Sequence, residues 1–371
     1  MRPGGVGMSS QYVQIHPQAL TAYIAAIACA VGSGEVEAQR VARNLVLANL
    51  SGHDSHGVGM MPWYVKYIGT GGLALNRSAQ VTGDMGAILM IDGQKGYGQV
   101  IGHEAMQLGI DRARQQGIAL VALRNSHHLG RIGQWAEDCA DAGLVSIHFV
   151  NALLWPLVAP YAGSDARFAT NPFCVGVPRD KAAPVILDFA TTKLALGKVR
   201  VAMQSGQPVP PDVLIDSAGR PTQDPRVMFE ADAAGKLGAM LAFGGHKGFG
   251  MALVCELLGG ALTGGATLHA PTHLDGIYNN MLSILIDPAR LAGDALHREM
   301  ESFIDWVRLS PVAPGYDRVR IAGEPELEKR QERAQAIPIE LATWNDLRQC
   351  AVQAGMSETD IASHTGAGRF C

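Results

Sequence analysis

The stretch Ile118–Val150, IALVALRNSHHLGRIGQWAEDCADAGLVSIHFV, carries the pattern that decides the fold class. Its apolar runs at 118–123 and 144–150 have the length and residue types of buried strands. The segment 132–142 between them has the spacing of a helix that buries one face. Strands that alternate with helices in this way predict an α/β fold.

The rest of the chain continues this alternation. Residues 16–50 predict two helices around a break at Gly32-Ser33-Gly34, and 204–226, rich in Pro, Gly and Asp, predict an ordered surface excursion. Further strands are predicted at 87–92, 184–187 and 281–286, and further helices at 103–116, 248–262, 299–309 and 342–354, with 248–262 buried.

Composition limits the class of partner. The chain has 371 residues, of which 47% are hydrophobic, enough for a large core and two joined domains. Thirty Lys and Arg residues against 34 Asp and Glu residues give a net charge of −4, and no basic tract is present. A small molecule is therefore a better candidate partner than a nucleic acid.

Cysteine spacing and hydropathy point to a cytoplasmic protein without membrane association. The six cysteines lack CxxC or zinc-finger spacing, which is typical of reduced thiols and argues against structural zinc. The apolar run 19–31 imitates a signal peptide, but Arg2 is the one fixed positive charge before it and an amphipathic helix follows it. The best membrane-like run, 251–268, is interrupted by Glu256.

A first histidine cluster, GHDSHGVG at 52–59, follows the second predicted helix. Histidine exchanges protons near neutral pH, so Ser55 and His56 could orient and transfer a proton to a substrate oxygen. His53, Asp54 and His56 could instead hold a divalent metal, as in a metal-dependent hydrolase, although the spacing is not that of HExxH zinc sites. A buried polar turn is a third interpretation, and spacing alone leaves all three open.

A second cluster, NSHHLG at 125–130, lies at the end of a predicted strand. The adjacent His127 and His128 point in different directions, so one of them is expected to face a site. If a helix begins here, His128 and Arg131 share a face and could grip a carboxylate together. A solvated Arg131 is the alternative.

Two glycine-rich segments could approach a phosphate. GYGQVIG at 96–102 lies between a strand and a helix, but no acidic residue follows at the distance that a Rossmann dinucleotide site requires. GGHKGFG at 244–250 runs into a helix and adds Lys247, which suits a phosphate-bearing cofactor or a plain glycine turn; it lacks the Walker spacing. ATNP at 169–172 and LDFATT at 187–192 could line a polar pocket or cap helices.

Taken in order, these motifs resemble the type-2 malate/L-lactate dehydrogenase family of NAD(P)-dependent oxidoreductases. The resemblance covers nearly the whole chain, including PTQDP at 221–225 and GEPE at 323–326, and is strongest to members that reduce 2-oxo acids. It implies a mixed-sheet, non-Rossmann α/β fold of the sulfolactate dehydrogenase-like type in a homodimer. A NAD(P)-binding domain at 126–284 would be inserted into a helix-rich dimerisation and substrate domain formed by 1–125 and 285–371.

The resemblance also implies roles for individual residues. His56 would donate the proton to the 2-oxo group with Ser55 orienting it and His128 close to the reacting carbon, although in some members the histidine matching His128 carries the proton. NAD or NADP would be bound by residues matching family positions: Asn151, Thr170, Asn171, Asp188, Phe189, Ala190, Thr191, Thr192, His246, Lys247, Gly323 and Glu324.

One position departs from the family pattern. Many relatives have a substrate-binding arginine where this chain has Met60, and methionine offers neither charge nor donor. We hypothesise that Arg131 supplies the cation, while Met60, Met61 and Trp63 form an apolar pocket for bulky or aromatic 2-oxo acids such as phenylpyruvate or hydroxyphenylpyruvate. A malate, lactate, ureidoglycolate or cyclic-imine enzyme of the same family is the alternative, and a nucleotide-sensing protein without activity is the non-enzyme option.

Overall fold

The computed structural model describes residues 12–269, 275–365 and 369–370, and the chain forms two compact units. The first, here called the terminal unit, comprises residues 1–76 and 325–371. The second, the central unit, comprises residues 77–324. The boundaries between these units, near residues 76 and 324, differ from the domain boundaries expected near 125 and 285. A cofactor domain at 126–284 stays a prediction.

The terminal unit is mainly helical. Its described elements are β1 (Tyr12–Ile15), α1 (Pro17–Ala30), α2 (Glu35–Leu50), α3 (Met61–Gly69), most of α9 (Glu324–Glu332), β12 (Ile337–Glu340), α10 (Leu341–Gln353), α11 (Glu358–Thr365) and β13 (Arg369–Phe370). β1 pairs antiparallel with both β12 and β13. The two helices predicted around the glycine break at 32–34 are confirmed, because α1 and α2 pack together through buried residues such as Tyr23 and Leu45.

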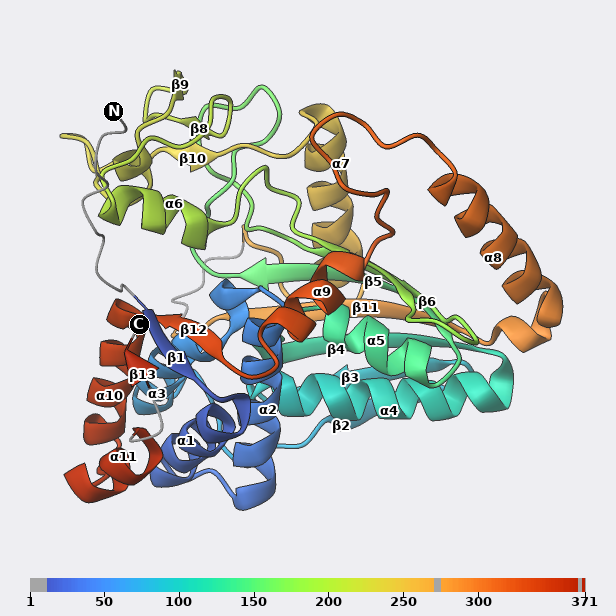
Figure 1. The fold of residues 1–371 in the computed structure, drawn as a ribbon, viewed down its shortest axis with the longest axis horizontal. Coiled ribbons are helices and arrows are strands. Elements are labelled where there is room, and N and C mark those ends of the chain that lie inside the picture. The colour runs from blue at the N-terminus through green and yellow to red at the C-terminus, as the bar shows by residue number, and fades with distance from the viewer. Residues whose placement is uncertain (1–11, 270–274, 366–368, 371) are drawn as a thin grey trace, which may run out of the picture. The chain divides into compact units, whose positions relative to one another are not determined.

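A seven-stranded mixed sheet forms the centre of the central unit (Figure 1). Its order is β2 (Gln80–Met85), β3 (Ile88–Asp92), β4 (Ile118–His127), β11 (Tyr278–Ile286), β5 (Val145–Leu153), β6 (Phe173–Val177) and β7 (Val185–Phe189). β3 and β4 are parallel, and every other neighbouring pair is antiparallel. The predicted mixed-sheet α/β fold is therefore confirmed.

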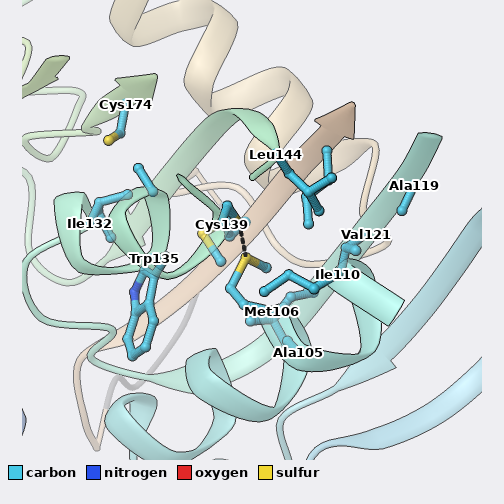
Figure 2. Close-up of a cluster of buried hydrophobic side chains, with 14 of the residues drawn as sticks. Ala105, Met106, Ile110, Ala119, Val121, Ile132, Trp135, Cys139, Leu144 and Cys174 are labelled. Atoms are coloured by element: carbon cyan, nitrogen blue, oxygen red, sulfur yellow. Dashed lines mark hydrogen bonds between the residues drawn. The ribbon is translucent and has the colours of Figure 1, made fainter. Parts of the chain in front are cut away.

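Helices cover both faces of this sheet. α4 (Gly98–Gln116) and α5 (Gly133–Asp141) bury their apolar sides against one face, where Met106, Trp135 and Cys139 pack among strand residues (Figure 2). α7 (His246–Cys255) and the π-helical segment Glu256–Ala261 that continues it lie on the opposite face. This packing is close, since a Cβ at Gly259 would come within 2.7 Å of the Phe149 carbonyl oxygen of β5.

The remaining central elements lie outside the large sheet. The predicted excursion at 204–226 contributes to a small sheet of β8 (Leu214–Ile215), β9 (Pro221–Thr222) and β10 (Ala239–Met240), beside α6 (Leu196–Gln204). The amphipathic α8 (Asp294–Arg308) follows β11.

Three predicted elements differ from the structure in their extent or burial. α4 begins at Gly98, inside the glycine segment 96–102, and β4 continues to His127, so the second histidine cluster starts on a strand. The prediction that 248–262 is buried is wrong, because Leu257 and Leu262 are 50% and 61% exposed. Across the described ranges, none of the helices has both the length and the apolar character that crossing a bilayer needs.

Candidate active site

The first histidine cluster forms a short 3₁₀ turn, Asp54–His56, directly after α2. The Asp54 carboxylate accepts hydrogen bonds from Asn49 Nδ2 at 2.6 Å and from Arg333 Nη1 at 2.8 Å. His53 Nε2 lies 3.1 Å from Glu326 Oε1. Two of the three residues considered as metal ligands are thus engaged by other side chains, and the described residues contain no cluster of three His, Cys, Asp or Glu arranged for a metal.

Asn49 holds the turn that presents Ser55 and His56. Its Oδ1 accepts a hydrogen bond from Val58 N at 2.8 Å, and a Cβ at Gly57 would lie 2.2 Å from this oxygen. Glycine at 57 is therefore required for the amide to reach the backbone. Ser55 is exposed and His56 is half-buried, so both can meet solvent or a ligand.

The apolar residues after this turn are not equivalent. Met60 and Trp63 are partly exposed, but Met61 is fully buried in the core and cannot line a substrate pocket as expected. Trp63 stacks on Tyr67 with ring centroids 6.1 Å apart, under the Lys66 ammonium.

Burial separates the adjacent histidines of the second cluster. His127 ends β4 and is fully buried, and burial lowers its pKa to about 3, so its ring stays neutral at physiological pH. Its Nε2 accepts a hydrogen bond from Ile277 N at 3.4 Å. His128 follows the strand and is 8% exposed, and the next amide, Leu129 N, donates to Asn279 Oδ1 at 2.8 Å. His128 is thus the better candidate for proton transfer at this cluster.

Arg131 does not have the arrangement that its spacing from His128 predicts. α5 begins at Gly133, so the two residues precede the helix and share no helical face. The guanidinium is 3% exposed, with Nη2 2.7 Å from Glu137 Oε1. A Cβ at Gly133 would lie 2.3 Å from Arg131 Nη1 and 2.9 Å from Asp188 Oδ2, so a second carboxylate faces the same charge. Nη1 and Nη2 have no hydrogen-bond partner among the described residues, but the acidic side chains around them already balance the charge, which disfavours Arg131 as the substrate's cation.

Asn151 and Asn171 hold a buried carboxylate that the sequence analysis did not assign to the site. Asn171 Nδ2 donates to Glu256 Oε2 at 2.7 Å, and Asn151 Nδ2 lies 3.3 Å from Glu256 Oε1. Asn171 Oδ1 also accepts from Ala152 N, and all three side chains are buried. Within this structure both asparagines therefore position the π-helical segment against β5.

The threonines predicted to bind a cofactor lie on paired backbone. Thr191 Oγ1 donates to the Thr170 carbonyl oxygen at 2.8 Å, and Thr191 O accepts from Phe243 N at 3.0 Å. The Thr192 hydroxyl is buried and has no hydrogen-bond partner among the described residues. Phe189 packs its ring between Phe173 and Phe243, and Ala190 follows it at the end of β7.

The glycine turn before α7 has left-handed backbone and leads directly into the helix start. Gly244 and Gly245 have φ of 55° and 60°, and a Cβ at Gly248 would lie 2.2 Å from the Phe243 carbonyl oxygen. His246 and Lys247 are exposed at the helix start, which no side chain caps. Lys247 N and Gly248 N donate to Gly244 O and Phe243 O, so the helix N-terminus and the exposed Lys247 ammonium are the features that fit a phosphate group. Thr192, which bridges to Ala242 just before this turn, offers its orphaned hydroxyl as a further donor.

Gly323 and Glu324 lie beside β7. Gly323 has φ of 95°, and the preceding Ala322 carbonyl accepts a hydrogen bond from Ile186 N at 3.1 Å. Glu324 accepts from Arg308 Nη2 at 2.6 Å, so its carboxylate is paired within the central unit.

A polar cavity of about 420 Å³ contains residues that sequence reasoning missed. It is lined by Asp92, Lys95, Arg124, Asn125, Leu153, Gly264, Gly265, Ala266, Asp275, Tyr278 and Asn280. Left-handed backbone at Lys95 and Asn125 marks the cavity, but such conformations cannot be read from residue types. A smaller cavity of about 210 Å³ on α10 and α11 contains no predicted site residue.

Comparison with known proteins identifies relatives along nearly the whole chain. A family model described as malate/L-lactate dehydrogenase matches residues 15–348. Hydroxycarboxylate dehydrogenase B of Escherichia coli K12 is 47% identical over 93% of this chain and 95% of its own length. The solved structure of a malate/lactate dehydrogenase-like protein from E. coli has a TM-score of 0.91 at 46% identity, covering 95% of this chain and 98% of that one. Sulfolactate dehydrogenase of Methanocaldococcus jannaschii has a TM-score of 0.83 at 28% identity, covering 94% and 99%.

Proposed function

The chain belongs to the malate/L-lactate dehydrogenase family of oxidoreductases, and we propose that it reduces bulky 2-oxo carboxylates reversibly to 2-hydroxy carboxylates. The observation that carries this proposal is the similarity to hydroxycarboxylate dehydrogenase B together with the two histidine clusters on glycine-bounded turns. A nicotinamide dinucleotide, when bound, supplies or accepts the hydride.

Each compact unit offers one histidine for proton transfer to the substrate oxygen. His56, with Ser55 beside it, is the proposed donor, and His128 is the second candidate. A general acid must lie within hydrogen-bond reach of the oxygen that it protonates. His56 and His128 can meet this requirement, since neither side chain is fully buried as His127 is.

The cofactor is proposed to lie along the segments of the central unit that carry unsatisfied donors. Thr192 would donate its buried hydroxyl, and the N-terminus of α7 with the Lys247 ammonium would bind a phosphate. The backbone of these cofactor segments would be shaped by Thr170, Thr191 and Gly323. The same backbone would be positioned by the side-chain hydrogen bonds of Asn151, Asn171 and Asp188. Whether NAD or NADP is preferred is decided by the experiment below.

The preference for a bulky side chain rests on Met60. A thioether in place of an arginine removes a cation and adds flexible apolar surface, and Trp63 adds aromatic surface in the helix that begins directly after Met60. Other relatives are named L-lactate dehydrogenase, L-sulfolactate dehydrogenase and Delta(1)-pyrroline-2-carboxylate/Delta(1)-piperideine-2-carboxylate reductase, so the substrate panel has to include small, acidic and cyclic members. The homodimer and the cytoplasmic location stay predictions.

The test follows nicotinamide absorbance with NADH and NADPH across pyruvate, oxaloacetate, phenylpyruvate, hydroxyphenylpyruvate and a cyclic imine carboxylate. We expect the largest kcat/KM for an aromatic 2-oxo acid; a preference for oxaloacetate or the imine would refute the substrate class. His56→Ala or His128→Ala should lower kcat by about 10²–10⁴-fold, with exposed His16→Asn as the control. If both alanine variants keep kcat within about twofold, the proton-transfer role is wrong.

A further inference from the structure

The polar cavity lies at one edge of the central sheet. Asp92 ends β3 and Arg124 lies near the end of β4, and because these strands are parallel their carboxyl ends meet at this edge. Tyr278 begins β11 at the same edge, opposite His127 of β4 and Leu153 of β5. Open α/β sheets bind ligands outside the carboxyl ends of their parallel strands, so the position suits a binding site.

The cavity wall is continuous with the second histidine cluster. Asn125 N donates to Asn280 Oδ1 at 2.9 Å, and Asn280 Nδ2 donates to Asn151 Oδ1 at 3.0 Å. The neighbouring Asn279 side chain accepts a hydrogen bond from the backbone amide of Leu129, the residue after His128. Two consecutive asparagines of β11 therefore connect the cavity to the loop that carries His128.

The two acids of the cavity are already satisfied. Asp92 accepts from Gln94 N at 2.8 Å, Asn125 Nδ2 at 2.9 Å and Arg124 Nε at 3.2 Å. Burial raises the pKa of Asp92, but these hydrogen bonds outweigh it and hold the pKa below its usual range. Both acids stay ionised at neutral pH, because the Tyr278 hydroxyl, 2.6 Å from Asp275 Oδ1, likewise lowers the pKa of Asp275.

The two cations of the cavity keep unused donors. Arg124 has five N–H groups, and within the described residues only Nε has a hydrogen-bond acceptor. Its Nη1 faces Gly264, where a Cβ would come within 3.2 Å, so glycine leaves the guanidinium fork accessible. Lys95 Nζ lies 3.4 Å from Asp275 Oδ2 and 5.3 Å from the centre of the Tyr278 ring, with its side chain 42% exposed.

Charge and hydrogen-bond capacity together define the ligand. Two acids and two cations cancel in net charge, but the acids have acceptors filled while the cations have donors free. A ligand that completes this site must accept hydrogen bonds, and a planar oxyanion matches the guanidinium fork. The cavity volume of about 420 Å³ is that of a small-molecule site.

We propose that Arg124 and Lys95 bind the carboxylate of a small organic acid in this cavity. The carboxylate belongs either to the substrate of the proposed reaction, in which case the inference rests on the proposed function, or to a second organic acid. A substrate carboxylate held here would be paired with the cations of this cavity, Arg124 and Lys95.

The test measures binding of oxamate, a 2-oxo acid analogue that is not reduced, by titration calorimetry with and without NADH. Lys95→Gln should raise the dissociation constant about tenfold, whereas Lys95→Arg should restore it to within about twofold. Lys181→Gln, at an exposed lysine of the same unit, is the matched control and should change nothing. Arg124→Lys keeps the charge but loses the fork, and its melting temperature checks that the Asp92 contact is not needed for folding.

The outcomes separate the sources. If KM for 2-oxo acids rises in Lys95→Gln by the same factor as the oxamate constant, the site holds the substrate carboxylate. If KM is unchanged while oxamate binding weakens, the site takes a second organic acid. The proposal is overturned if natively folded Lys95→Gln and Arg124→Lys both bind oxamate as the unaltered protein does. It is also overturned if the unaltered protein does not bind oxamate. Absence of turnover with every 2-oxo acid refutes the proposed function alone, since the calorimetry still reports on this site.

Discussion

Replacing Arg131 with methionine tests whether this buried arginine is structural. Its Nη2 contacts Glu137 Oε1 at 2.7 Å with the two side chains 3% and 14% exposed, and Asp188 Oδ2 lies beside Gly133 near Arg131 Nη1. Methionine fills a similar volume but leaves the largely buried Glu137 without its cation. We therefore expect Arg131→Met to reduce stability and to leave substrate affinity in the surviving folded protein unchanged.

The magnitude follows from the burial. Removing one partner of a buried ion pair costs about 3–5 kcal/mol, because the remaining charge keeps its desolvation penalty. In a unit of the size formed by residues 77–324, each kcal/mol shifts the melting temperature by about 2–4 °C. The variant should therefore melt on the order of 10 °C below the unaltered protein.

Thermal unfolding followed by circular dichroism provides the assay, with KM for 2-oxo acids measured below the transition. Arg220→Met is the matched control, since Arg220 pairs with Asp216 at 2.9 Å but is 78% exposed and should cost at most about 1 kcal/mol. Adding Glu137→Leu to Arg131→Met should recover part of the lost stability, because the Glu137 carboxylate is then no longer left without its cation, whereas Asp188 remains. A native melting temperature combined with a KM raised more than about tenfold would show that Arg131 binds substrate.

Three further changes have definite outcomes. Gly57→Ala introduces a Cβ 2.2 Å from Asn49 Oδ1 and should lower the melting temperature and kcat, whereas Gly59→Ala, 3.3 Å from its nearest side-chain atom, should be nearly neutral in calorimetry and turnover. Burial holds the pKa of His148 at about 3, so below pH ~6.5 only the unfolded chain gains this proton, and the free energy of unfolding falls by about 1.4 kcal/mol per pH unit. His148→Gln should flatten this slope in urea unfolding between pH ~6.5 and ~4. An unchanged slope would contradict the assignment of the slope to His148. Glu256→Gln weakens charge-assisted hydrogen bonds from two buried asparagines and should cost about 2 kcal/mol in urea unfolding; a loss below about 0.5 kcal/mol would refute it.

Periodicity and composition predicted elements well where one physical signal dominates. The glycine break at 32–34 separates α1 from α2 because no side chain there favours continued helix, and the apolar runs at 118–123 and 144–150 became central strands. Short edge elements such as β1 and β12 were missed, since pairing with distant segments, rather than local pattern, stabilises them.

The prediction of the site was limited by contacts that have no sequence period. Glu256 interrupts an apolar run, and its role became visible only when Asn151 and Asn171 were found on its carboxylate. Arg124 and Lys95 lie 29 positions apart and meet because β3 and β4 are parallel neighbours. The individual roles of His56, His128 and the cofactor segments stay predictions for the variants described above.

The two arginines around the second histidine cluster differ in exposure and in neighbouring charge, because the Arg131 side chain is 3% exposed and that of Arg124 is 36% exposed. Spacing favoured Arg131, but an entering carboxylate there would meet Glu137 and Asp188 in a space closed to solvent. At Arg124 it would meet a second cation, Lys95, and a guanidinium whose fork has no acceptor among the described residues. Coulomb repulsion and desolvation both oppose binding at the first position, whereas greater exposure and a second cation favour it at the second. The carboxylate that Met60 cannot hold is therefore better sought at the sheet edge than at the start of α5.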